Sequence, residues 1–143
     1  MLTRTKVLFL CIGNACRSQM AEAIAKRLAA DVIEASSAGL VPFGDIPATT
    51  LTVLAERGFS AEGQRSKALL PEDLSAADLV INMTGRTGAS IFSDPTPPFE
   101  DWEVGDPYGS NLDVYRGICD QIEARVEDLA RRLRDKVDVH QTV

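Results

Sequence analysis

One short segment of the sequence combines the residue types that can bind a phosphate group and attack it. Cys11 and Arg17 have five residues between them, including Gly13 and Asn14, and Ser18 follows directly. The planar guanidinium of an arginine can bind two oxygens of a phosphate at once. A cysteine thiolate beside that phosphate is a nucleophile placed for in-line attack on phosphorus, and a serine hydroxyl can donate a hydrogen bond to its sulfur. The spacing therefore predicts nucleophilic catalysis at Cys11.

The elements that flank this segment explain how its backbone would hold the anion. The continuous apolar run at 5–10 is typical of a strand buried on both faces of a parallel sheet, and helical spacing predicts a helix over about 18–30. A loop that enters a helix N-terminus presents unpaired backbone N–H groups and the positive end of the helix dipole. Gly and Asn tolerate positive φ, so the loop can curl until these N–H groups converge on a tetrahedral oxyanion. The residues expected to bind phosphate or another oxyanion in this way are Ile12, Gly13, Asn14, Ala15 and Cys16.

A second group with suitable chemistry is Asp106, which lies in a Gly-Asp-Pro-Tyr-Gly loop ahead of the last predicted helix. Cleavage of a phosphate ester expels an alkoxide or phenoxide, so a proton donor is needed on the side of the leaving group. Pro107 fixes the backbone beside the carboxyl group. Tyr108 could form one wall of a slot for a flat ring, and Ile12 would line its floor.

The rest of the chain alternates strands and helices. We expect strands at 32–36, 79–83 and 102–104, helices at 48–57 and from 112 onward, a helical turn that Pro71 begins, and a loop at 93–98. Gly58 ends the second helix, and Ser110 with Asp113 predicts a capping box for the last one. This alternation predicts an α/β fold, a single-domain three-layer sandwich over residues 1–143 with a four-stranded parallel sheet and helices on both faces. A frayed tail is expected from about residue 137.

Composition narrows the class of protein. The chain has 143 residues, of which 45% are hydrophobic and 25% charged, the mixture of a globular protein with a buried core. No apolar run approaches the ~20 residues of a membrane-spanning helix, and the first one is too short for a signal peptide, so we expect a cytoplasmic protein without a membrane span. The net charge of −6 disfavours binding to nucleic acid. Three cysteines are too few for a disulfide scaffold and lack metal-ligand spacing, so no metal or organic cofactor is expected.

These motifs together resemble the low-molecular-weight protein tyrosine phosphatases. The run at 7–23 looks like the opening of that family, and three later tripeptides are similar to its landmarks in the same order: Ser37-Ala38-Gly39, Asp78-Leu79-Val80 and Asp106-Pro107-Tyr108. The resemblance covers essentially the whole chain. It implies a phosphoric monoester hydrolase that removes phosphate from phosphotyrosine in proteins, or from a small aryl phosphate, through a phosphocysteine intermediate.

The resemblance also implies roles for individual residues. Cys11 would be the nucleophile, Arg17 would bind and stabilise the phosphoryl group, and Asp106 would act first as the acid and then as the base. Asn14 and Ser37 are similar to the polar pair that braces the loop in this family. The histidine often present near residue 64 is missing, because Gln64-Arg65-Ser66 stands there.

Cys16 resembles the second loop cysteine of the family, which can form a reversible disulfide with the nucleophile under oxidation. A small packed thiol behind the loop is the other interpretation of Cys16. Cys119 lies on the apolar stripe of the last helix, where a core position is expected.

Two neighbouring activities stay open on the same scaffold. Arg17-Ser18-Gln19-Met20 resembles the thioredoxin-coupled arsenate reductases, but Thr84 stands where that branch has a cysteine of its disulfide relay, so a reductase would depend on an external thiol. The run at 105–116 is similar to the protein-arginine phosphatases, which have a threonine directly after the nucleophile. Ile12 occupies that position here, and a branched aliphatic side chain favours a phenyl ring over a P–N bond.

Overall fold

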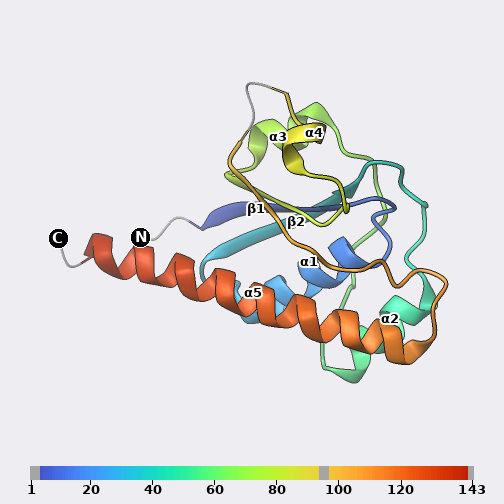
Figure 1. The fold of residues 1–143 in the computed structure, drawn as a ribbon. Coiled ribbons are helices and arrows are strands. Elements are labelled where there is room, and N and C mark those ends of the chain that lie inside the picture. Colours follow the sequence, from blue (N-terminus) through green and yellow to red (C-terminus); the bar gives the residue numbers. More distant parts are fainter. Residues whose placement is uncertain (1–3, 94–96, 142–143) are drawn as a thin grey trace.

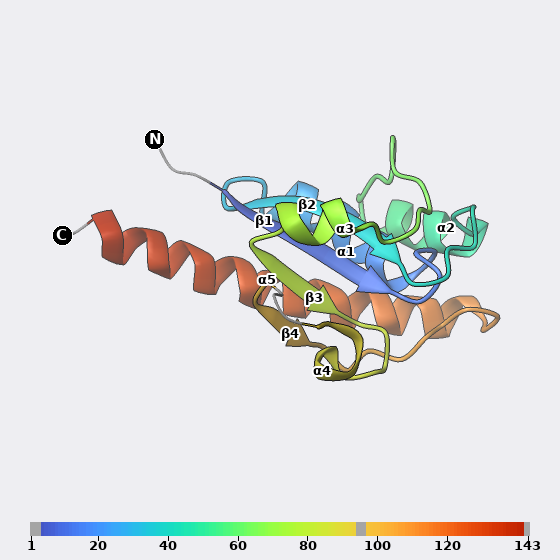
Figure 2. The ribbon, with the colours of Figure 1, turned by 90° about the horizontal axis from the view of Figure 1, so that it is seen from above.

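One sheet of four parallel strands forms the centre of the computed structural model, which describes residues 4–93 and 97–141 and the side chains as far as residue 136. The strands are β1 (Thr5–Cys11), β2 (Ile33–Gly39), β3 (Leu79–Asn82) and β4 (Phe99–Asp101). They lie in the order β2-β1-β3-β4 (Figures 1 and 2). The predicted four-stranded parallel sheet is therefore confirmed.

Helices cover both faces of the sheet, as predicted. Figure 1 shows α1 (Arg17–Leu28), α2 (Ala48–Glu56) and α5 (Leu112–Gln141) below the strands, with α3 (Pro71–Ala76) and α4 (Gly88–Ile91) above them. Successive side chains of a strand point to opposite faces. Val7 and Phe9 of β1 accordingly join the larger core, which lies between the sheet and the helices α1 and α5. Leu8 and Leu10 join the smaller core between the sheet and α3.

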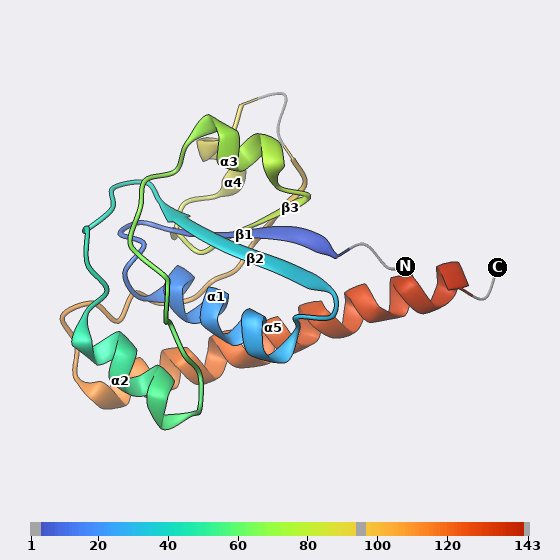
Figure 3. The ribbon, with the colours of Figure 1, turned by 180° about the vertical axis from the view of Figure 1, so that it is seen from behind.

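The long helix α5 is held along its length by one apolar stripe and by ion pairs at its edges. Its buried residues include Tyr115, Ile122 and Leu129, at the spacing of one helix face. Arg132 binds Glu100, and other arginines of α5 bind acids on α2 and on the turn before β2. The helix continues to Gln141, past the start of the predicted tail, and residues 142–143 lie outside the described part (Figure 3). Among the described residues no helix is long and apolar enough to cross a membrane.

The fourth strand differs from its prediction. It pairs as Val80 with Phe99 through Asn82 with Asp101, so it precedes the predicted residues 102–104. The reason is that β3 ends at Asn82, so residues 102–104 have no strand residues opposite them to pair with. Trp102 donates one last backbone hydrogen bond to the Asn82 carbonyl and then packs its ring against Phe9 in the core.

Two smaller features were also not as predicted. The helix α5 begins at Leu112, and the side chain that caps it is Asn111, whose Oδ1 accepts from the Val114 N–H at 3.0 Å. Ser110 therefore does not form the predicted capping box, and Asp113 pairs with Arg116 instead. The short helix α4 was not predicted.

The topology determines where a ligand can bind. The chain leaves β1 for β2 on one side and reaches β3 on the other, so the carboxyl ends of β1 and β3 meet at the point where the strand order reverses. Open α/β sheets bind ligands in the crevice at such a point. Cys11 is the last residue of β1, and Met83 directly follows β3.

Candidate active site

All carbonyl oxygens of the loop from Cys11 to Cys16 accept hydrogen bonds on the outer side of the loop. Each carbonyl accepts a hydrogen bond from a group beyond the loop. In chain order the donors are Leu40 N (3.2 Å), Val41 N (2.8 Å), Phe43 N (2.9 Å), Gln19 Nε2 (3.0 Å), Thr50 Oγ1 (3.2 Å) and Met20 N (2.9 Å). In a trans peptide the N–H points away from the carbonyl, so the N–H groups that follow these carbonyls face the inside of the loop. In the described part of the chain, the N–H groups of residues 12–16 donate to no protein acceptor. The loop therefore has the geometry of a cradle for an anion.

Asn14 holds the turn of this loop. Its φ is +49°, the left-handed region that asparagine tolerates better than most residues. Its Oδ1 accepts from Lys67 N at 2.8 Å, and its Nδ2 donates to Ser18 Oγ at 2.7 Å and to Ser37 Oγ at 3.0 Å. The side chain is fully buried, so each of these bonds replaces one that water would have made.

The two serines that accept from Asn14 each have a second polar partner. Ser18 Oγ accepts from Asn14 and lies 2.9 Å from Cys11 Sγ, so its own proton is free to be donated to the sulfur. The sulfur of Cys11 therefore lies within hydrogen-bond distance of a buried hydroxyl. Ser37 in turn donates to Glu22 Oε1 at 2.6 Å, and Lys26 Nζ lies 2.6 Å from the other oxygen of this carboxylate.

Glu22 and Gln19 are supporting residues that the sequence analysis missed. Both side chains are buried, and both point from α1 to the loop or to Ser37 beside it. Gln64, at the site of the missing histidine, donates to Gln19 instead and so braces the loop through a different group. The sequence held one signal of such a role: Glu22 is a charged residue within a run of apolar ones on α1, and when buried there it needs a polar partner.

Arg17 is oriented by backbone carbonyls from two distant segments. Its Nη1 donates to Met83 O at 2.6 Å and to Val104 O at 3.2 Å, and its side chain is almost wholly buried. Its Nε is buried and has no partner among the described residues, while Nη2 lies 3.6 Å from Asp106 Oδ2. The Nε–Nη2 edge of the guanidinium is thus left to bind two oxygens of an anion side by side.

The structure places Asp106 beside Arg17, with 3.6 Å between Oδ2 and Nη2. Half of its side chain is exposed, and its Oδ1 accepts from the Tyr108 N–H at 3.1 Å. The turn therefore holds the carboxyl and the tyrosine on one short segment.

Phe43 is the residue at the mouth that the sequence analysis did not find. Its ring contacts that of Tyr108 edge to face, with centroids 4.7 Å apart, and both rings are about half exposed. Three atoms across the Phe43 ring would lie 2.8–2.9 Å from a Cβ added at Gly13, so the ring lies flat on this glycine. An aromatic residue soon after the carboxyl end of β2 was the signal, since that end lies at the same edge of the sheet as Cys11.

The other cysteines have different surroundings from Cys11. Cys16 is buried behind the loop with its Sγ 3.5 Å from the Tyr115 hydroxyl, and burial raises the pKa of its thiol. Cys119 is in the core, where burial raises the pKa of its thiol to about 11. Thr84 is buried and donates to Asn82 Oδ1 at 2.7 Å. Cys11 is thus the cysteine that combines an anion cradle with a hydroxyl donor.

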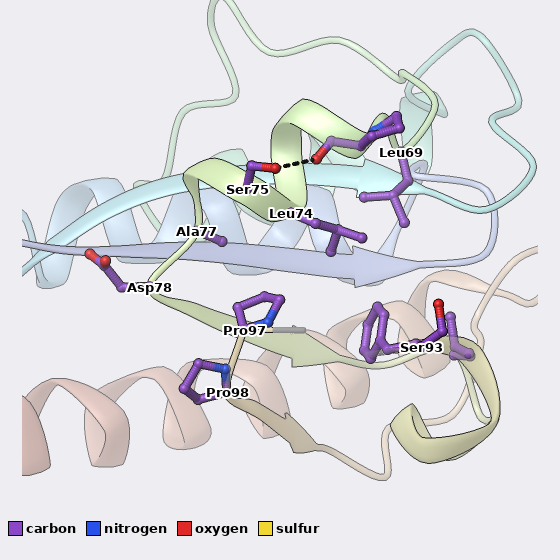
Figure 4. A pocket seen from close by; sticks show the side chains of 11 residues that line it. Leu69, Leu74, Ser75, Ala77, Asp78, Ser93, Pro97 and Pro98 are labelled. Carbon is purple, nitrogen blue, oxygen red and sulfur yellow. Dashed lines mark hydrogen bonds between the residues drawn. The ribbon is translucent and has the colours of Figure 1, made fainter. Parts of the chain in front are cut away.

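A separate pocket lies on the face of the sheet that α3 and α4 cover, and its described lining residues include no cysteine or arginine. It has a volume of about 700 Å³ between α3 and the segments around α4, and Figure 4 shows its mostly apolar side chains. Asp78 is the charged residue among its described lining residues, and this carboxylate accepts from Lys6 N at 2.9 Å. The described residues also bring together no cluster of His, Cys, Asp and Glu suited to a metal ion.

Fold and site together define an α/β enzyme with a cysteine in an anion-binding loop, and comparison with known proteins gives the family. Residues 6–139 match the family described as low molecular weight phosphotyrosine protein phosphatase. The chain belongs to this family.

Relatives within the family carry three different names. The glutaredoxin arsenate reductase of Synechocystis is 36% identical over 90% of this chain and 98% of its own. The solved structure of a low molecular weight protein tyrosine phosphatase from T. tengcongensis is 34% identical, covers 90% of this chain and 99% of its own, and has a TM-score of 0.79. The YwlE arginine phosphatase of Geobacillus stearothermophilus is 28% identical, covers 95% and 97%, and has a TM-score of 0.80. The family is therefore established, and the substrate must be argued from the site.

Proposed function

We propose that this protein is a cysteine-dependent phosphatase that hydrolyses phosphotyrosine. The observation that carries the proposal is the aromatic pair of Phe43 and Tyr108 at the mouth of the anion-binding loop. A phenyl ring gains from flat apolar surface at that point, whereas a bare phosphate or arsenate gains nothing from it. Ile12, half-buried in the same loop, adds a branched aliphatic side chain rather than a hydroxyl.

The proposed reaction has two steps that use the same residues. The Cys11 thiolate attacks phosphorus while the bond to the aryl oxygen breaks, and Asp106 gives its proton to that oxygen. The N–H groups of the loop and the Nε–Nη2 edge of Arg17 hold the three equatorial oxygens throughout. A water molecule then attacks the phosphocysteine, Asp106 takes its proton, and the S–P bond breaks to release phosphate and the thiolate. Such an acid contributes about 10²–10⁴-fold in rate.

Reduction of arsenate with an external thiol is a second candidate. It is supported by the similarity to the arsenate reductase of Synechocystis, at 36% identity. Cys11 would displace hydroxide from arsenate, and a small thiol would then attack its sulfur. The S–As bond would break with its electron pair going to arsenic, giving arsenite and a mixed disulfide that a second thiol reduces. The external thiol is needed because Thr84 occupies the place of the relay cysteine.

One experiment compares the candidates directly. The protein is given a phosphotyrosine peptide, a phosphoarginine peptide, and arsenate with glutathione and glutaredoxin, in parallel assays under reducing conditions. Cys11→Ser tests the nucleophile, and Cys119→Ala is the matched control because that thiol lies in the core. We expect turnover of phosphotyrosine that Cys11→Ser abolishes and Cys119→Ala retains.

The other outcomes replace the proposal in defined ways. Preference for the phosphoarginine peptide would keep the mechanism and change the substrate. Production of arsenite without release of phosphate from either peptide would make the second candidate correct. Turnover that survives in Cys11→Ser would overturn the mechanism itself.

A further inference from the structure

Ser66 connects the aromatic rim to the anion-binding loop. Its hydroxyl donates to Gly13 O at 3.0 Å and accepts from Gly44 N at 3.1 Å. The Phe43 N–H donates to the same Gly13 carbonyl at 2.9 Å. Three hydrogen bonds therefore connect residues 43 and 44 to the loop, and the Ser66 hydroxyl makes two of them.

The segment that carries Ser66 is itself well fixed. The carbonyl of Lys67 accepts from Gly39 N at 2.9 Å, and the N–H of Lys67 donates to Asn14 Oδ1 at 2.8 Å. Residue 68 forms a parallel bridge with Gly39 at the end of β2. Ser66 thus stands on backbone that is tied both to the sheet and to the loop, whereas Phe43 stands on a connection that is largely exposed.

We propose that Ser66 is a positioning residue that determines the preference of the site for aryl over alkyl phosphates, an inference that rests on the proposed function. Its bonds hold the Phe43 ring flat on Gly13, at the depth where it meets Tyr108. The anion cradle does not depend on it in the same way. When the hydroxyl is removed, Gly13 O keeps the Phe43 N–H as a donor, so the Asn14 N–H still points into the loop. Gly44 N loses its acceptor, so residues 43 and 44 keep one of their two hydrogen bonds and the Phe43 ring is held less firmly.

The test uses ligands that differ only in the group beyond the oxyanion. The affinities of phenylphosphonate and methylphosphonate are measured from the concentration at which each protects Cys11 against alkylation by iodoacetate. This readout requires no turnover. Ser66→Ala removes both hydrogen bonds of the hydroxyl. It should weaken phenylphosphonate by about three- to tenfold, because only part of their effect reaches the ligand, and methylphosphonate by less than about twofold. Ser66→Thr keeps the hydroxyl and should restore the preference.

Two further variants separate positioning from a general loss of structure. Ser60→Ala is the matched control, because within the described part of the chain that hydroxyl makes a local bond, accepted from Glu62 N in the same connection. Phe43→Leu should itself lower the phenyl preference, and Ser66→Ala should add nothing in that background, since coupled residues are not additive.

Three results would overturn the proposal. They are equal weakening of both phosphonates by Ser66→Ala, an undiminished effect of Ser66→Ala in the Phe43→Leu background, and a wild-type protein that does not prefer phenylphosphonate. A lack of phosphotyrosine turnover would contradict the proposed function alone, because the ratio of the two phosphonates is measured without it.

Discussion

Replacement of Asn14 by alanine or by glycine separates the two ways in which this residue shapes the loop. Either change removes the three buried hydrogen bonds to Ser18, Ser37 and Lys67. Only alanine also places a β-carbon without a polar group at a φ of +49°. The two variants therefore share one loss and differ in the other.

The magnitudes follow from these contacts. Three hydrogen bonds at about 1 kcal/mol each predict that Asn14→Gly lowers the free energy of unfolding by about 3 kcal/mol. The left-handed conformation costs alanine about 1 kcal/mol more, so Asn14→Ala should lose about 4 kcal/mol. Domains have stabilities of about 5–15 kcal/mol, so both variants should remain folded at room temperature.

Urea unfolding measures the free energies, and the rate of Cys11 alkylation by iodoacetate at fixed pH measures the chemical consequence. Without Asn14, the Ser18 hydroxyl loses a hydrogen bond that holds it beside the Cys11 sulfur, so alkylation should slow in both variants. A loss below about 1 kcal/mol in both would refute the role given to the side-chain network. Equal losses would show that the positive φ carries no cost, and unchanged alkylation would show that the contact between Ser18 and the Cys11 sulfur has no effect on the reactivity of that sulfur.

Three further outcomes are expected. Gly13→Ala should displace the Phe43 ring, because a Cβ would lie 2.8 Å from it, and should weaken phenylphosphonate more than methylphosphonate in the same protection assay. Asp106→Asn should slow turnover of phenyl phosphate by about 10²–10⁴-fold and that of 4-nitrophenyl phosphate much less, and equal slowing would show that this carboxyl is not the acid. Since burial raises the pKa of Cys119 from 9.0 to about 11, folding favours its protonated form. This contribution is complete below pH 9 and is lost as the pH rises through 11, so urea unfolding should show an alkaline loss of about 2–3 kcal/mol that Cys119→Ala lacks.

Local sequence determined the parts of this protein that depend on neighbouring residues. The apolar run of β1, the glycine and asparagine after it, and the start of α1 are consecutive, so the anion cradle could be predicted from segment 5–18. The alternation of periods likewise predicted the parallel sheet with helices on both faces. Asp106 was singled out through the resemblance of Asp106-Pro107-Tyr108 to a family landmark, and the structure places it 3.6 Å from Arg17.

Tertiary structure decided the features that join segments far apart in the chain. Arg17 is oriented by carbonyls of residues 83 and 104, and Phe43 is held by Gly13 and Ser66; no spacing in the sequence indicates these pairs. The last strand lies at 99–101 because β3 ends at Asn82, so residues 102–104 have no neighbouring strand to pair with. The position of this strand therefore depends on its pairing with β3 and not on its own residues. Local propensity reports what a segment can adopt, whereas the contacts that position a side chain depend on which distant backbone groups packing brings within hydrogen-bond reach.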